Sequence, residues 1–189
     1  MRLLMLIVAL SFGITGCTSF LNLTRSEPIQ TNPGKRTFGA KIDDSIIETK
    51  VTVNIDKASS ELEQKSRIIV VSYNGIVLLT GQTPSNEARQ LAGQVASSVR
   101  GVRSVKNQIQ VSPMIAFLVR SSDTYLTTKV KSAMLWRRNV PGKRIKVVTE
   151  NGVVYLMGLV TRQEADNAAK LASGVSGVQK VVKLFEYIN

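Results

Sequence analysis

The residue types that most often carry out enzymatic chemistry are scarce or poorly spaced in this sequence. The 189 residues include no histidine, which excludes a histidine-based triad, a histidine metal ligand and a histidine general base. Three pairs of carboxylates are close in sequence, namely Asp43 and Asp44, Glu61 and Glu63, and Glu164 and Asp166. Two of these pairs lie near predicted helix starts, where acids favour the helix dipole. The glycines lack the spacing of a phosphate-binding loop. We therefore expect no catalytic site and no cofactor.

A single cysteine, Cys17, is the residue with the most distinctive chemistry. Because it is the only cysteine, it cannot form an intramolecular disulfide. It follows Thr15-Gly16 and an apolar run, Leu3–Ile14, that is shorter than the roughly 20 residues a spanning helix needs. An aliphatic residue and small residues before a cysteine are typical of a lipobox. The pattern predicts that residues 1–16 are a removable signal peptide and that Cys17 carries the lipid anchor. The alternative is a plain cysteine in an ordinary signal or anchor segment.

The predicted location and the net charge together indicate the type of partner. Residue 18 is Thr rather than the Asp that tends to retain enteric lipoproteins at the inner membrane, so we expect the outer membrane, facing the periplasm. The formal net charge is +12, which favours a polyanionic partner. Nucleic acid is scarce in the periplasm. Anionic phospholipid, such as phosphatidylglycerol or cardiolipin, is therefore the expected partner, and nucleic acid is not.

Positive charge is concentrated between Arg120 and Val148, where eight Lys or Arg residues stand against one acid, Asp123. If this segment forms a helix, one stripe of its residues faces the core. A second stripe, of aromatic and polar residues, then lies about 100° around the helix from the first. Aromatic rings alternating with cations suit a membrane interface. The predicted lipid-binding residues are Tyr125, Lys129, Lys131, Ser132, Trp136, Arg137 and Arg138.

The same segment allows less specific interpretations. Tyr125 could pack against the other half of the protein while Trp136 covers the edge of the core, since large aromatic side chains are usually at least half buried. The basic side chains could simply be solvated. The apolar segment Met114–Val119 is expected to pack between two modules, with a protein-docking strand as the alternative.

The body of the protein is an internal repeat with an offset of 76 to 79 residues. The clearest matches are Asp44–Val51 with Asp123–Val130, and Asn74–Gly81 with Asn151–Gly158. The pattern predicts an α+β fold with two αββαβ units, each a three-stranded mixed sheet packed on two helices. We expect a tether over residues 17–41, a first domain over 42–112, a linker over 113–121 and a second domain over 122–189.

The elements of each unit follow from local signals. Opening helices are expected over Asp44–Ile55 and Thr124–Arg138, with Asp123 as the N-cap of the second. Asn-Gly pairs supply the positive φ angles that two tight hairpin turns require. Second helices should begin at Thr83-Pro84 and at Thr161, followed by closing strands. Each unit is small, so the two units should pack together.

These features carry a resemblance to a known family. The αββαβ repeat, with its hairpin Asn-Gly pairs and the later pairs Gly101-Val102 and Gly177-Val178, resembles the BON domain. Two such units behind a lipobox are similar to the dual-BON outer-membrane lipoproteins. The resemblance implies that the first helix of the second domain contacts anionic phospholipid, with Tyr125 at a position where the family has Trp. Trp136 lies outside the positions that can be matched.

The resemblance also implies a role in outer-membrane integrity at division sites. It implies links to the outer-membrane assembly machinery and to peptidoglycan amidase regulators. The alternative is a periplasmic adaptor that binds envelope proteins and contacts lipid only incidentally. A nucleic-acid-binding protein would require that the lipobox be spurious.

Overall fold

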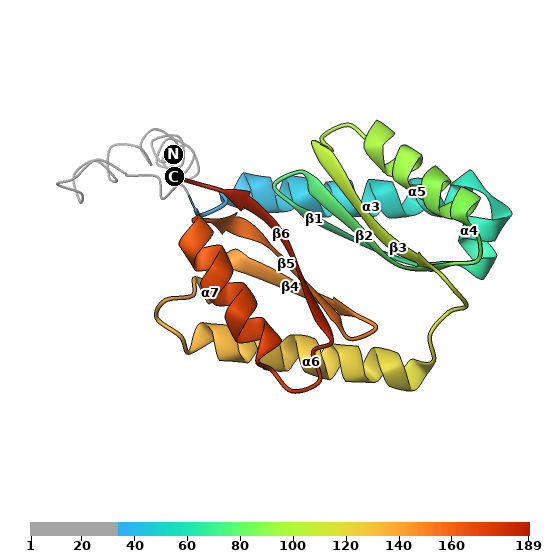
Figure 1. The fold of residues 1–189 in the computed structure, drawn as a ribbon. Coiled ribbons are helices and arrows are strands. Elements are labelled where there is room, and N and C mark those ends of the chain that lie inside the picture. Colours follow the sequence, from blue (N-terminus) through green and yellow to red (C-terminus); the bar gives the residue numbers. More distant parts are fainter. Residues whose placement is uncertain (1–33) are drawn as a thin grey trace, which may run out of the picture. The chain divides into compact units, whose positions relative to one another are not determined.

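The computed structural model describes residues 34–189, which belong to one compact unit (Figure 1). The predicted signal peptide, the predicted lipidation site Cys17 and the tether up to residue 33 lie outside the described residues. The body consists of two repeats of the same order of elements. The predicted α+β fold, with two αββαβ units, is confirmed.

The first repeat contains three helices and three strands. In chain order they are α3 (Phe38–Ala58), α4 (Ser60–Lys65), β1 (Arg67–Tyr73), β2 (Ile76–Thr83), α5 (Asn86–Ser98) and β3 (Ser104–Val111). α3 begins six residues before the predicted start at Asp44, because Thr37 caps it by accepting a hydrogen bond from the amide of Ala40 (3.1 Å). The short helix α4 was not predicted. The predicted start of α5 at Thr83-Pro84 is wrong, since Thr83 still belongs to β2 and Ser85 is the N-cap.

The second repeat has the same elements without a counterpart of α4. They are α6 (Phe117–Leu135), the 3-10 turn η1 (Gly142–Arg144), β4 (Ile145–Glu150), β5 (Val153–Val160), α7 (Arg162–Ser173) and β6 (Lys180–Tyr187). The predicted capping box at Thr161 is present, because the side chain of Thr161 accepts from the Glu164 amide and the Glu164 carboxylate accepts from the Thr161 amide.

Three predictions about the start of the second repeat are wrong. α6 begins at Phe117, so Asp123 lies within the helix and is not its N-cap, and five of the nine residues assigned to a linker are helical. The apolar segment Met114–Val119 neither packs between the repeats nor forms a strand. Met114, Phe117 and Leu118 are largely exposed.

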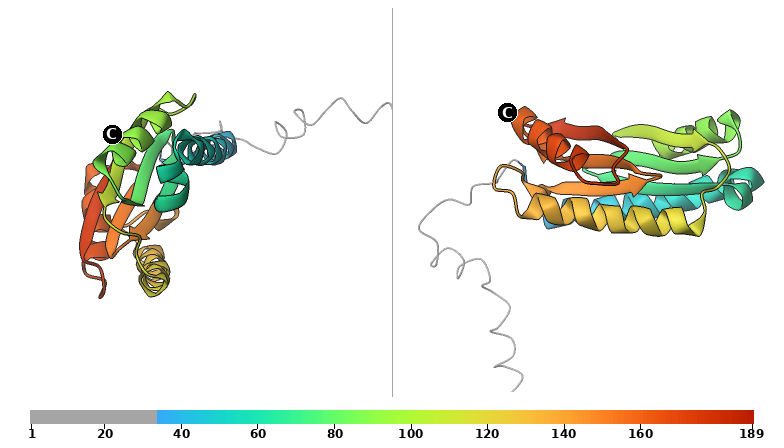
Figure 2. Two further views of the ribbon diagram at one scale, coloured as in Figure 1. Left: turned by 90° about the vertical axis from the view of Figure 1, so that its right-hand side faces the viewer. Right: turned by 60° about the horizontal axis from the view of Figure 1, so that its bottom comes forward.

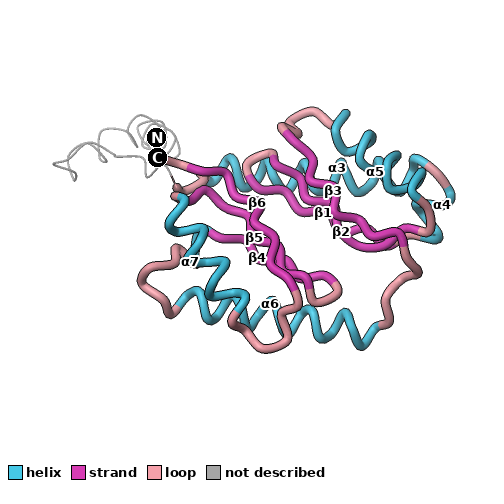
Figure 3. The backbone as a smooth tube through the Cα atoms, in the orientation of Figure 1, coloured by secondary structure: helices cyan, strands magenta, loops and turns pink. Residues whose placement is uncertain are grey.

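Each repeat forms its own three-stranded sheet, with orders β1-β2-β3 and β4-β5-β6 (Figure 3). The first two strands of each sheet are antiparallel, and the last two are parallel. Gly81 has a φ of 122°, and a Cβ atom there would lie 2.0 Å from the carbonyl oxygen of Arg67 on the paired strand. A glycine is therefore required where β2 crosses the start of β1.

One face of each sheet packs on helices, and the other face packs on the second sheet. Small residues let α5 and α7 approach their sheets closely, and Ala92, Ala96, Ala168 and Ala172 are fully buried. The buried residues between the two sheets are Val71, Tyr73, Leu78, Tyr155 and Met157. α3 and α5 pack next to each other on the outer face of the first sheet, and α6 and α7 on the outer face of the second (Figure 2). The prediction that the two units pack together is therefore confirmed.

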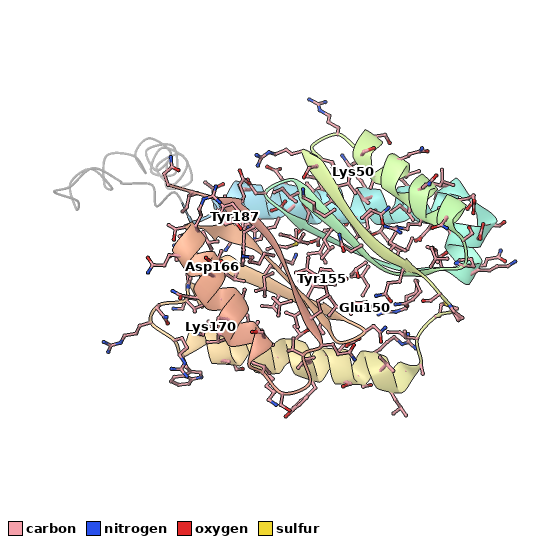
Figure 4. All side chains as sticks on the ribbon, viewed as in Figure 1. Lys50, Glu150, Tyr155, Asp166, Lys170 and Tyr187 are labelled. Carbon is pink, nitrogen blue, oxygen red and sulfur yellow. The ribbon has the colours of Figure 1, made fainter. Side chains whose placement is uncertain are left out.

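Polar contacts between the repeats surround this apolar centre. Glu150 at the end of β4 accepts hydrogen bonds from Arg67 (2.6 Å) and from Gln82 (2.8 Å) of the first repeat. At the other end of β1, the Tyr73 hydroxyl of the first repeat donates to the carbonyl oxygen of Arg144 (2.7 Å). Figure 4 labels Glu150 and its neighbour in the interface, Tyr155. Desolvation by burial raises the pKa of Tyr155 above its usual value.

A buried aspartate in each opening helix holds the hairpin turn of its own repeat. Asp44 accepts from the amides of Asn74 (2.8 Å) and Gly75 (2.9 Å), and Asp123 accepts from the equivalent amides of Asn151 (2.7 Å) and Gly152 (2.9 Å). The two turn residues lie beyond the last paired residues of the strands, so their amides are not used by the strand pairing. The repeated aspartate therefore fixes each opening helix relative to its sheet, and it thereby positions α6.

Candidate functional site

One side of α6 presents a continuous stripe of exposed residues, which we call the α6 face. Its members are Leu118, Ser122, Tyr125, Lys129, Ser132 and Trp136, all exposed. They follow one another at spacings of four and three residues, so they stay within one narrow sector over about 27 Å of helix. The side of α6 about 100° around the helix, which holds Leu126, Val130 and Met134, is buried against the second sheet, as predicted.

The aromatic residues of the α6 face are open to solvent. Tyr125 is 68% exposed and Trp136 is 88% exposed. The alternative in which Tyr125 packs against the other repeat while Trp136 covers the core edge is therefore wrong. Leu118, 80% exposed, was not predicted as a member of the stripe, because the helix was expected to begin only at Thr124. Exposed apolar side chains that gather on one side of a helix are typical of an interaction site.

Trp136 owes its exposure to the way α6 ends. Trp136 is the C-cap of the helix, and the chain then turns back through Val140, which is buried in the core of the second repeat. A Cβ atom at Gly142 would lie 2.8 Å from the backbone of Met134, so only glycine lets the returning loop pass this close to the helix end. The loop over 136–143 is thereby held at the end of α6, with Trp136, Arg137, Arg138 and Lys143 all exposed.

The cations of the segment divide into two groups. Three of them make contacts within the fold: Arg144 pairs with Glu164, Lys146 with Glu48 (2.7 Å), and Lys131 bonds to backbone carbonyls. The exposed cations with no carboxylate partner among the described residues are Arg120, Lys129, Arg137, Arg138 and Lys143. Lys129 lies 6.0 Å from the ring centre of Tyr125 and donates to the Ser176 carbonyl (3.3 Å), so it stays on the α6 face.

Lys131 does not lie on the α6 face, although it was predicted among the lipid-binding residues. Its ammonium group donates to the carbonyl oxygens of Gly142 (2.7 Å) and Ile145. Desolvation by burial lowers its pKa below the usual value of 10.5. Lys131 therefore joins α6 to the loop before β4, and its contribution is structural.

This difference predicts unequal losses of stability for two charge reversals that are two residues apart. Lys131→Glu should lower the free energy of unfolding by about 2 kcal/mol, because it removes charge-assisted bonds to two carbonyl groups. Lys129→Glu should leave the stability within about 0.5 kcal/mol, as is usual for exposed positions. Urea unfolding followed by far-UV circular dichroism measures both. Equal stabilities of the two variants would show that the Lys131 contacts contribute nothing.

The part of the chain that the structure describes offers no metal site and no spanning helix. No group of three or more His, Cys, Asp or Glu side chains is gathered within it. Among the helices of residues 34–189, none is both long and apolar enough to cross a membrane. The two carboxylates of the pair Asp43 and Asp44 lie in different environments. Asp44 is buried and bonded to the hairpin turn, whereas Asp43 is exposed.

Comparison with known proteins identifies the repeats. The sequence pattern of the BON domain matches residues 43–113 and 122–189. The chain belongs to the BON family. The two matches coincide with the two αββαβ units, so we call them BON1 and BON2. The α6 face is then the exposed side of the opening helix of BON2.

Three relatives resemble the chain over most of its length. It is 43% identical to outer membrane lipoprotein DolP of Haemophilus influenzae, over 85% of this chain and 82% of the relative. It is 39% identical to the 21 kDa hemolysin of Actinobacillus pleuropneumoniae, over 81% and 78% of the two chains. It is 32% identical to osmotically-inducible protein Y of Escherichia coli, over 76% and 72%. The recognition of a dual-BON protein from its sequence is confirmed.

Proposed function

We propose that this chain is an outer-membrane lipoprotein whose BON2 domain binds anionic phospholipid through the α6 face and which supports outer-membrane integrity at division sites. The observation that carries the proposal is the exposure of Tyr125 and Trp136 on one side of a helix, beside cations that no carboxylate of the described residues neutralises. In this proposal the protein is not an enzyme. Its task is to recognise a membrane composition.

The chemistry of the α6 face matches the interface of a bilayer. Amphipathic rings lie at the depth of the headgroups, where their apolar bodies leave water and their polar edges do not. Lys and Arg side chains near an anionic surface contribute about 1 kcal/mol each. BON1 has no such cluster of cations on its opening helix, where Asp43, Glu48 and Asp56 oppose the lysines.

The similarity to a relative named as an outer membrane lipoprotein supports the proposed anchor and its location. In the proposal, signal peptide removal leaves Cys17 as the first residue, and its acyl chains hold the protein in the outer membrane. The α6 face then gives a second contact that depends on lipid charge, whereas the anchor alone inserts into any bilayer.

Vesicle binding tests the lipid-charge dependence. The chain from Thr18 onward, without the anchor, should bind phosphatidylcholine vesicles that contain phosphatidylglycerol or cardiolipin, and it should bind pure phosphatidylcholine vesicles far more weakly. Binding should weaken as salt is added, because ions screen exposed charges. The variant Lys129→Glu/Arg137→Glu/Arg138→Glu should bind about 100-fold more weakly, from about 1 kcal/mol for each cation.

A matched variant separates the α6 face from net charge. Lys106→Glu/Lys170→Glu/Lys180→Glu changes three exposed lysines on β3, α7 and β6 and alters the net charge equally. It should retain most of the affinity. If both triple variants lose binding to the same extent, the α6 face has no special part. If the unmodified chain does not prefer anionic vesicles, the adaptor that binds envelope proteins becomes the better account.

A further inference from the structure

BON1 carries an exposed apolar stripe that its own fold does not use. Phe38, Ile42 and Ile46 recur every four residues along the start of α3 and are 78%, 45% and 45% exposed. The side of α3 that packs on the sheet holds a different set, Ile47 and Val51 with their neighbours. The stripe lines a shallow depression of about 550 Å³ together with Lys41 and Lys50. An aromatic and two branched aliphatic side chains thus lie on one sector of the helix. The flanking lysines are fewer than the cations of the α6 face, and the exposed Asp43 offsets one of them.

The start of α3 is joined to the end of the second repeat at which the loop over 136–143 lies. Arg36, just before α3, stacks over the ring of Tyr73 at 3.6 Å and pairs with Asp44. The hydroxyl of Tyr73 donates to the carbonyl oxygen of Arg144. Gly34 is so close to Arg144 that an added Cβ atom would collide with the guanidinium group. The segment entering α3 is therefore packed against the base of the loop that presents Trp136.

The two helices lie on the outer faces of the two sheets and run in opposite directions, so α3 begins at the end of the body where α6 ends (Figures 1 and 2). A flat surface laid against this end of the body is thus near both Trp136 and the first turns of α3. Charge favours the same surface, since Lys35 and Lys41 are exposed next to Phe38, and Arg137, Arg138 and Lys143 are exposed next to Trp136.

We infer that BON1 contributes a second membrane contact, formed by Phe38, Ile42 and Ile46 at the start of α3, which continues the lipid-binding surface of BON2 across the repeat boundary. This inference rests on the proposed function of the α6 face. It assigns the protein a tilted orientation, in which the end of the body nearest the predicted tether lies on the bilayer and the far end of α3 stays in water.

The predicted anchor at Cys17 favours the bilayer as the surface that covers this stripe. Only residues 18–37 separate the predicted acylated Cys17 from Phe38, so the stripe begins a short length of chain after the anchor. Because the anchor holds this end of α3 near the lipid surface, the effective lipid concentration at Phe38 is high. Lysines on both flanks then favour anionic headgroups.

The single tryptophan of the chain makes a direct test possible. The full acylated chain is reconstituted into vesicles of phosphatidylcholine and phosphatidylglycerol in which some lipids carry bromine on their acyl chains, and quenching of tryptophan fluorescence is measured. Three proteins are compared: the unmodified chain, which reports on Trp136, and the variants Trp136→Phe/Phe38→Trp and Trp136→Phe/Val53→Trp. Val53 is 44% exposed and lies about 22 Å further along α3.

The inference predicts at least twofold stronger quenching for the Phe38→Trp probe than for the Val53→Trp probe. Equal quenching of the two probes would overturn it, whether both are quenched or neither is. A blue shift of the Phe38→Trp probe that depends on protein concentration and appears without vesicles would also overturn it, because a second copy of the chain would then cover the stripe. Quenching of Trp136 in the unmodified chain tests the BON2 contact separately, so each contact can fail without the other.

Discussion

Replacing Asp44 with alanine is expected to lower the free energy of unfolding by about 4 kcal/mol. The carboxylate is buried and accepts hydrogen bonds from the Ser72 hydroxyl (2.7 Å) and from two hairpin amides, and it also pairs with Arg36. Removing one partner of such a buried ionic cluster leaves its donors unsatisfied. Urea unfolding at neutral pH measures the change. Asp43→Ala is the matched control, since Asp43 is exposed and the effect there should stay within about 0.5 kcal/mol.

The pH dependence of this effect follows from the pKa of Asp44. Burial alone would raise the pKa, but the hydrogen bonds from Gly75, Ser72, Asn74 and Arg36 together lower it below its ordinary value of 3.8. The ionised group therefore stabilises the fold fully above that ordinary value, and the stabilisation is lost as the pH falls through the lowered pKa of the folded state. The stability gap between the unmodified chain and Asp44→Ala should be constant above about pH 5 and should close below about pH 4. A gap that grows in acid would contradict the assigned role.

The double variant Tyr125→Ser/Trp136→Ser should lose about 100-fold in affinity for vesicles that contain phosphatidylglycerol. Each ring is largely exposed in the free protein, so its transfer to the headgroup region removes much apolar area from water. A contribution of about 1.5 kcal/mol for each ring corresponds to this loss. Co-sedimentation of the chain from Thr18 onward with vesicles measures it.

The stability of the fold should be unchanged in that variant, because neither ring packs against the core. Val53→Ser/Val111→Ser removes two exposed apolar side chains elsewhere and should bind vesicles as the unmodified chain does. If the loss of affinity were the same in both double variants, apolar exposure in general would be responsible. The α6 face would then lose its assigned role.

Much of the fold could be predicted because the repeat displays the same local signals twice. Asn74-Gly75 and Asn151-Gly152 adopt the positive φ angles that their types predict, and each fixes the register of a hairpin. The alanine stripes of α5 and α7 predict close packing on a sheet, and they are buried there. Helix starts were harder to predict. Asp123 has the type and position of an N-cap, yet its carboxylate bonds to a hairpin 28 residues away, a contact that local spacing does not reveal.

The candidate site was predictable where helical spacing alone decides exposure, and not where tertiary contacts decide it. Tyr125 and Trp136 lie on the side of α6 away from the core, as periodicity requires. Lys131 carries the same charge as Lys129, but the return of the chain at Gly142 places two carbonyl groups within reach of its ammonium. The stripe of Phe38 and Ile42 was missed because the helix was expected to begin at Asp44. The spacing of four residues between Phe38, Ile42 and Ile46 was the signal in the sequence that could have revealed an apolar stripe on a longer helix.

The emission of Trp136 in the unmodified chain from Thr18 onward tests the central claim most directly, because no other tryptophan contributes. Phosphatidylcholine vesicles with an increasing fraction of phosphatidylglycerol are added at low salt, and the emission maximum is followed. The account predicts a saturable blue shift that requires the anionic lipid and is reversed by added salt. An emission maximum that remains that of a water-exposed indole at every lipid composition would contradict it.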